Sequence, residues 1–157
     1  MYRPGAVGAL LDIYEQAIQD FKKVIEDISD DVLTMHIDPH TTDENCKSIQ
    51  TVLSHVVSSG YSYAIYINNL KGHQAIRPEK TFHATTKEYL EDLNQVFAYT
   101  ENVFKNIKDQ ELEQFDDAKR IITSWGQHYD IEQLMEHAIV HILRHQRQIE
   151  KFKNVVL

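Results

Sequence analysis

The sequence predicts an all-α protein that folds as one four-helix bundle. Four long stretches repeat apolar residues at spacings of three and four, the period of an amphipathic helix, and no stretch sustains the alternation of a half-buried strand. The 157 residues include only three Pro and five Gly, which leaves room for few turns and therefore favours long elements. A chain of this length usually forms one domain, so we expect residues 1–157 to be a single unit.

The first two helices are expected over residues 6–28 and 48–72. The first carries one apolar stripe from Leu10 to Ile28, and the connection after it is rich in turn formers and contains Pro39, which bars a continuing helix. This connection is long for a bundle, so it has the length to cross the bundle end. Ser48 is a good N-cap for the second helix, and Gly72 is a typical stop signal.

The last two helices are expected over residues 85–108 and 130–155. Thr85 and Glu88 stand at capping-box spacing ahead of the third helix, and Asp130 and Gln133 do so ahead of the fourth. The linker between these helices is first acidic and then apolar, and it contains the only tryptophan. Four such helices pack naturally as a bundle, although a simple up-down-up-down order does not follow from the pattern.

The composition excludes several classes of protein. The net charge of −8 argues against nucleic acid as a partner, because phosphate neutralisation needs clustered Lys and Arg. The single cysteine, Cys46, cannot form an intramolecular disulfide and fits a reducing compartment. No run approaches the ~18 apolar residues of a membrane span, and acidic residues interrupt the N-terminal apolar run, so no signal peptide is expected. We therefore expect a soluble cytoplasmic protein.

Histidines mark the candidate site. His137, His141 and His145 are spaced four apart in the fourth helix, and four residues advance a helix by 400°, so His141 and His145 differ by only about 40° in direction. Both follow the apolar stripe into the bundle, whereas His137 lies about 80° from His145. One helix is therefore unsuited to hold all three on one ion, and a third ligand must come from elsewhere.

The second helix offers that ligand. His55 is the one histidine inside another predicted helix, and three neutral imidazoles would leave coordination positions open for water or a substrate atom. Spacing alone also permits the simpler interpretation that these are hydrogen-bonded core histidines. His36 and His40 have the same spacing, but Pro39 lies between them, so we expect them to be solvent-exposed. His73, His83 and His128 fall in connections, and we expect them to be structural or incidental.

Other metal-site templates do not match the chain. A zincin needs HExxH, a di-iron bundle needs Glu-x-x-His, and iron–sulfur or zinc-ribbon sites need several cysteines. None of these patterns occurs in the sequence. A mononuclear histidine site is what remains.

The chain resembles the DinB/YfiT-like family. The resemblance rests on "HILRHQRQI" in the last helix, "SIQTVLSH" at the start of the second, and the overall length with four long helices. It implies an up-down-down-up bundle, usually dimeric, with a divalent metal held by His55, His141 and His145. Gln148 matches a family position that we interpret as support for a ligand. The chain departs from many relatives at Arg147 and at Cys46 or Lys47, which leaves its subfamily and substrate open.

The resemblance also implies a metal-dependent enzyme that acts on a small-molecule substrate. In this interpretation the metal activates either a low-molecular-weight thiol for S-transferase chemistry or a water for hydrolysis. Zn and Ni are the favoured ions, followed by Fe, Co and Mn. The alternative is a non-enzymatic, metal- or ligand-binding stress-responsive bundle. A homodimer is expected from the family, with the broad apolar face of the second helix as further support.

Several other residues have two interpretations each. Cys46 is a nucleophile or an ordinary thiol near a helix start, and the second is favoured because no base is in view. Tyr61, Tyr63 and Tyr66 line a pocket or belong to the core. His137 is a catalytic candidate, as a proton shuttle beside the metal, or a satisfied core or surface residue.

Overall fold

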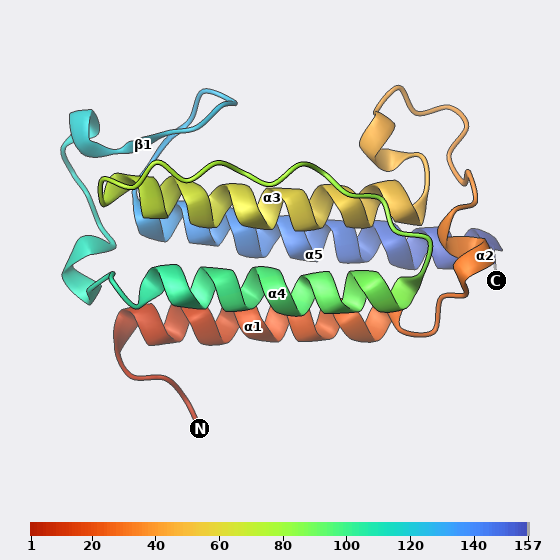
Figure 1. Ribbon diagram of the computed structural model, residues 1–157, viewed down its shortest axis with the longest axis horizontal. Coiled ribbons are helices and arrows are strands. Elements are labelled where there is room, and N and C mark those ends of the chain that lie inside the picture. The colour runs from red at the N-terminus through yellow and green to blue at the C-terminus, as the bar shows by residue number, and fades with distance from the viewer. Residues whose placement is uncertain (157) are drawn as a thin grey trace.

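The computed structural model describes residues 1–156 and shows four long helices that lie side by side along one axis (Figure 1). They are α1 (Gly5–Ile25), α3 (Ile49–Leu70), α4 (Thr86–Phe104) and α5 (Ile131–Val156). The connections contain the short elements α2 (Asp30–Leu33), η1 (Glu44–Cys46), η2 (Asp109–Glu111), η3 (Asp117–Lys119), β1 (Ile121–Ile122) and β2 (His128–Tyr129). The predicted all-α bundle is confirmed.

The order of the helices is up-down-down-up. In Figure 1, α1 and α5 run in one direction, and α3 and α4 run in the other. Two parallel neighbours in sequence need a connection that returns along the bundle, and residues 71–85 provide it by passing over α3 from one end to the other (Figure 1). The crossing connection is thus the second one, and the first joins two antiparallel helices at the same end.

Three capping signals in the sequence are confirmed. The Ser48 hydroxyl accepts a hydrogen bond from Thr51 N at 3.1 Å, and Thr85 accepts one from Glu88 N at 3.4 Å. Asp130 Oδ1 accepts from Gln133 N at 2.8 Å, and Gln133 Oε1 accepts from Asp130 N at 3.0 Å, which completes a reciprocal cap. The C-terminal ends were predicted less well, because α1 and α4 end three and four residues before residues 28 and 108.

The core runs the length of the bundle between the four helices. Among its fully buried side chains are Tyr14, Phe21, Leu53, Tyr89, Leu93 and Leu134. At Gly60, α3 and α4 approach each other closely, since a Cβ there would come within 2.8 Å of Val96 Cγ2. The apolar residues of α3 are largely buried within this one chain, and homodimerisation stays a prediction.

The linker between α4 and α5 forms a small hairpin that the sequence pattern did not predict. Strands β1 and β2 are antiparallel, with Ile121 opposite Tyr129 and Ile122 opposite His128. Thr123 N donates to Gln127 O at 2.9 Å, and Gly126 takes a positive φ of 92°, which a glycine adopts without strain. The hairpin is anchored to α3, because Ser124 N donates to the Tyr66 hydroxyl at 2.8 Å. It therefore carries Trp125 over one end of α3.

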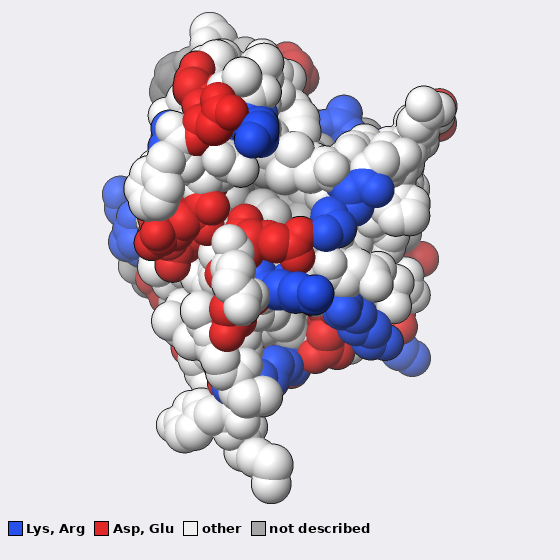
Figure 2. Space-filling model, turned by 90° about the vertical axis from the view of Figure 1, so that its left-hand side faces the viewer, with Lys and Arg blue, Asp and Glu red and all other residues white. Residues whose placement is uncertain are grey.

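The surface at the hairpin end of the bundle carries charges of both signs close together (Figure 2). At this end Lys71, which follows α3, pairs with Glu111 in η2. Arg3 pairs with Asp12 at 2.6 Å and with Glu101 at 2.6 Å, which ties the N-terminal segment to α1 and α4. None of the helices within residues 1–156 combines the length and apolar character that a membrane crossing needs.

Candidate metal centre and adjacent cavities

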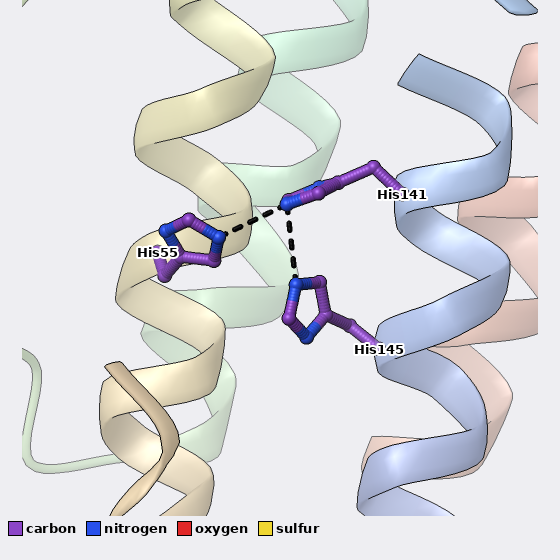
Figure 3. Close-up of side chains that lie close together, drawn as sticks. All are labelled: His55, His141 and His145. Carbon is purple, nitrogen blue, oxygen red and sulfur yellow. Dashed lines mark hydrogen bonds between the residues drawn. The ribbon is translucent and has the colours of Figure 1, made fainter. Parts of the chain in front are cut away.

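Three histidines from two helices converge on one point between α3 and α5 (Figure 3). His141 Nε2 lies 3.0 Å from His55 Nε2 and 3.1 Å from His145 Nε2. The three nitrogens all lie within 4.8 Å of one another. The structure therefore brings together the three histidines that the sequence analysis selected, and they could hold a metal ion.

Helix geometry explains why these side chains meet. His141 and His145 are one turn apart on α5 and share a face, while His55 lies one turn and a half into α3, on the face that packs against α5. His145 is buried, and the other two are partly buried. Packing of α3 against α5 thus aligns the three imidazoles.

The contacts between the three imidazoles cannot all be hydrogen bonds. A neutral ring nitrogen has either one hydrogen or one lone pair, so His141 Nε2 cannot direct a proton along both of its contacts. The two contacts therefore cannot both be well-aligned hydrogen bonds. A cation that accepts the three lone pairs removes this conflict, and the donor set of imidazole nitrogens suits Zn and its neighbours in the first transition row.

Gln148 determines which ring nitrogen of His145 is free to bind a metal. His145 Nδ1 lies 2.8 Å from Gln148 Oε1, which can only accept, so Nδ1 carries the hydrogen and Nε2 keeps its lone pair. Ring nitrogens oriented in this way are characteristic of metal-binding histidines. The supporting role proposed for Gln148 from the sequence agrees with this geometry.

Burial keeps the cluster uncharged. It lowers the pKa of His55 to about 4 and that of His141 to about 3, and the neighbouring His145 adds to both effects. It also lowers the pKa of His145, although the hydrogen bond to Gln148 opposes the change. Neutral imidazole is the form that binds a metal, so the cluster is ready for a cation at neutral pH.

A cavity of about 730 Å³ opens beside the cluster on the hairpin side. We call it the aromatic cavity, because Tyr63, Tyr66 and Trp125 line it together with His137; His55 and His141 also line it. Its volume lies within the ~300–1,000 Å³ typical of small-molecule sites. Of the three tyrosines noted in the sequence, Tyr63 and Tyr66 line this cavity, whereas Tyr61 packs against Tyr99 with ring centroids 5.4 Å apart.

A second cavity, of about 520 Å³, reaches the same histidines from the other side. We call it the charged cavity; its lining comprises Arg144, Arg147, Lys151, Asp43, Cys46, Gln148 and the three clustered histidines. Burial raises the pKa of the Cys46 thiol, and the Asp43 carboxylate, 3.5 Å from its sulfur, raises it further. A thiol of this kind is protonated at neutral pH, which favours the interpretation of Cys46 as an ordinary thiol.

His137 lies outside the cluster but inside the aromatic cavity. Its ring centroid is 5.1 Å from that of Trp125 and 5.6 Å from that of Tyr63, and its Nδ1 is 3.2 Å from the Tyr129 hydroxyl. Burial lowers its pKa. Sequence reasoning named His137 but missed its neighbours Trp125 and Tyr129. No helical pattern could connect them to His137, because they lie in the hairpin.

The remaining histidines are peripheral to the site. His36 and His40 are exposed, as predicted, and so are His73 and His128. His83 is partly buried, and its Nε2 lies 2.6 Å from Asp92, so its role is structural as expected. The equal spacing of His36 and His40 therefore carried no information about a site.

A family model and a solved structure match this chain. A sequence model described as the DinB family matches residues 1–151. A solved structure described as the conserved protein of locus from Enterococcus faecalis has a TM-score of 0.64 and 12% identity to this chain, and the match covers 98% of each. At that identity the likeness concerns the fold alone. No curated protein sequence matches the chain.

Proposed function

Since this chain belongs to the DinB family, we propose that it is a metal-dependent enzyme in which His55, His141 and His145 hold one divalent ion. The convergence of three Nε2 atoms from two helices, with a proton conflict that a cation would remove, supports this assignment. Zn or Ni suits three imidazoles best, followed by Fe, Co and Mn. When bound, such an ion would supply an acidified water or thiol as the nucleophile.

The observation that carries the enzymatic proposal is the presence of two cavities that share His55 and His141. A structural metal site is closed by protein ligands, whereas a catalytic site keeps positions open. Here the space on both sides of the cluster is open to small molecules. The aromatic cavity favours an apolar reactant, and the charged cavity, with three cationic side chains, favours an anionic one.

Two separate cavities favour group transfer over hydrolysis. A transferase must hold two organic reactants on either side of the reacting atoms, while a hydrolase needs one cavity and water. We therefore place a low-molecular-weight acidic thiol in the charged cavity and an apolar electrophile in the aromatic cavity. Hydrolysis is the second candidate, because the aromatic cavity alone would serve it.

Thiol conjugation assays test the proposal. Purified protein loaded with Zn²⁺ or Ni²⁺ is incubated with glutathione or bacillithiol and a panel of electrophiles, and the same preparation is assayed on nitrophenyl esters. We expect metal-dependent conjugation that His141→Ala abolishes. Ester cleavage without conjugation would favour the hydrolase. Absence of both activities across the panels, with metal bound, would favour a non-enzymatic binding protein.

A further inference from the structure

His137 is the one histidine of the aromatic cavity that does not belong to the cluster. Its ring is held between Trp125, Tyr63 and Tyr129, whose ring centroids lie 5.1, 5.6 and 5.8 Å away. It lies one helical turn before His141 on α5, so the two side chains are roughly 5–6 Å apart at Cβ. A molecule in the cavity beside His141 is therefore within reach of His137.

A chain of hydrogen bonds fixes the position of the proton on His137. The Trp125 indole can only donate, and it lies 2.6 Å from Gln127, so the contacted atom is the amide oxygen Oε1. The Tyr129 hydroxyl lies 2.6 Å from the same oxygen and must donate its single proton there. The Tyr129 oxygen can then only accept from His137 Nδ1 at 3.2 Å. His137 Nδ1 therefore carries the hydrogen.

The opposite edge of the ring is left as an acceptor. In a neutral imidazole with hydrogen on Nδ1, Nε2 has a lone pair. No hydrogen bond to His137 Nε2 is formed within residues 1–156, although the ring is partly buried and lines the cavity. An acceptor that has no protein partner and belongs to a residue lining the cavity is available to a hydrogen-bond donor on a molecule bound there.

We propose that His137 is a ligand-binding residue that selects, for the aromatic cavity, molecules with a flat apolar body and a hydrogen-bond donor directed at Nε2. The flat body matches the rings of Tyr63, Tyr66 and Trp125. The donor is a hydroxyl, amine or thiol group. The assignment deepens the proposed function, on which it rests for the identity of the cavity as the substrate site.

The proton arrangement is tested first, by NMR of protein labelled with ¹⁵N in histidine. The ring-nitrogen shifts of His137 are compared in the wild-type protein and in Tyr129→Phe, which removes the acceptor for Nδ1 but keeps the ring. We expect a protonated Nδ1 and a bare Nε2 in the wild type, and a mixture of both neutral forms in Tyr129→Phe. A protonated Nε2 in the wild type would overturn the proposal.

Ligand selection is tested next with phenol and anisole, which have the same ring but differ in the donor. One good neutral hydrogen bond corresponds to about fivefold in affinity, so phenol should bind about fivefold more tightly and shift His137 Nε2, whereas anisole should not shift it. His137→Phe keeps an aromatic wall and should bind both equally. Equal binding to the wild type, or a phenol preference that persists in His137→Phe, would overturn the proposal.

Performing both titrations in metal-free and in Zn²⁺-loaded protein separates this inference from the proposed function. The preference for phenol should be the same in both states, because His137 is not one of the three clustered histidines. A preference that appears only with Zn²⁺ would assign the donor to the metal site and contradict the role of His137. Failure of metal binding or of thiol conjugation would leave the NMR result unchanged.

Discussion

The hydrogen bond between Gln148 and His145 leads to a sharp prediction for metal affinity. Gln148 Oε1 accepts from His145 Nδ1 at 2.8 Å and so keeps the lone pair on Nε2, where a metal would bind. Gln148→Ala removes this acceptor and frees the imidazole to exchange its proton and to rotate. Loss of such a supporting partner typically lowers metal affinity about 10–100-fold, or about 1.4–2.7 kcal/mol.

The chain supplies a matched control for this substitution. Gln146 lies two residues earlier on α5, and its amide donates to Glu150 at 3.2 Å instead of contacting a histidine. The assay is competition for Zn²⁺ against a chromophoric chelator near neutral pH. We expect Gln148→Ala to weaken binding 10–100-fold and Gln146→Ala to leave it within about twofold of the wild type. Equal affinities for all three proteins would refute the reasoning.

Three further predictions concern stability. Burial lowers the pKa of all three clustered histidines below the ordinary ~6.5, so below that pH the unfolded state of the metal-free protein binds more protons than the folded state. The free energy of unfolding of the metal-free protein should therefore fall as the pH is lowered from about 6.5 to about 5. Urea titrations that give the same free energy across this range would contradict the prediction. Gly60→Ala places a Cβ 2.8 Å from Val96 Cγ2 and should lower the free energy of unfolding, measured by urea denaturation, by about 1–3 kcal/mol. Adding Val96→Ala should restore part of this loss. An unchanged free energy of unfolding in Gly60→Ala would show that α3 and α4 separate freely. Asp130→Ala removes the acceptor for Gln133 N and should lower the free energy of unfolding by about 1 kcal/mol, which corresponds to a melting temperature lower by roughly 2–4 °C. An unchanged melting temperature would show that the cap is redundant.

The helices could be predicted from the sequence because their signals are local. Ser48, Thr85 and Asp130 cap the backbone within three residues of themselves, and the apolar stripes extend over many turns. The C-terminal ends depend on tertiary packing more than on local signals, which explains why α1 and α4 were predicted too long. The direction of α4 depends on the crossing connection over α3, and the family resemblance supplied it where the periodicity could not.

The candidate site was predictable in part for the same reason. His141 and His145 share a helical face by spacing, and His55 was selected because it is the one histidine in another helix interior. The aromatic cavity was not predictable, because it depends on a hairpin with two residues in each strand. Such strands are too short to show alternation, and the bond from Ser124 to Tyr66 that places Trp125 joins residues 58 positions apart.

The metal content of the purified protein tests the central claim most directly. Plasma mass spectrometry on wild-type protein, on His141→Ala and on the matched control His137→Ala measures ions per chain. We expect about one divalent transition-metal ion per chain in the wild type and in His137→Ala, and the loss of most of this metal in His141→Ala. A wild-type protein that neither carries nor takes up such an ion, or a His141→Ala variant that retains it in full, would contradict the account.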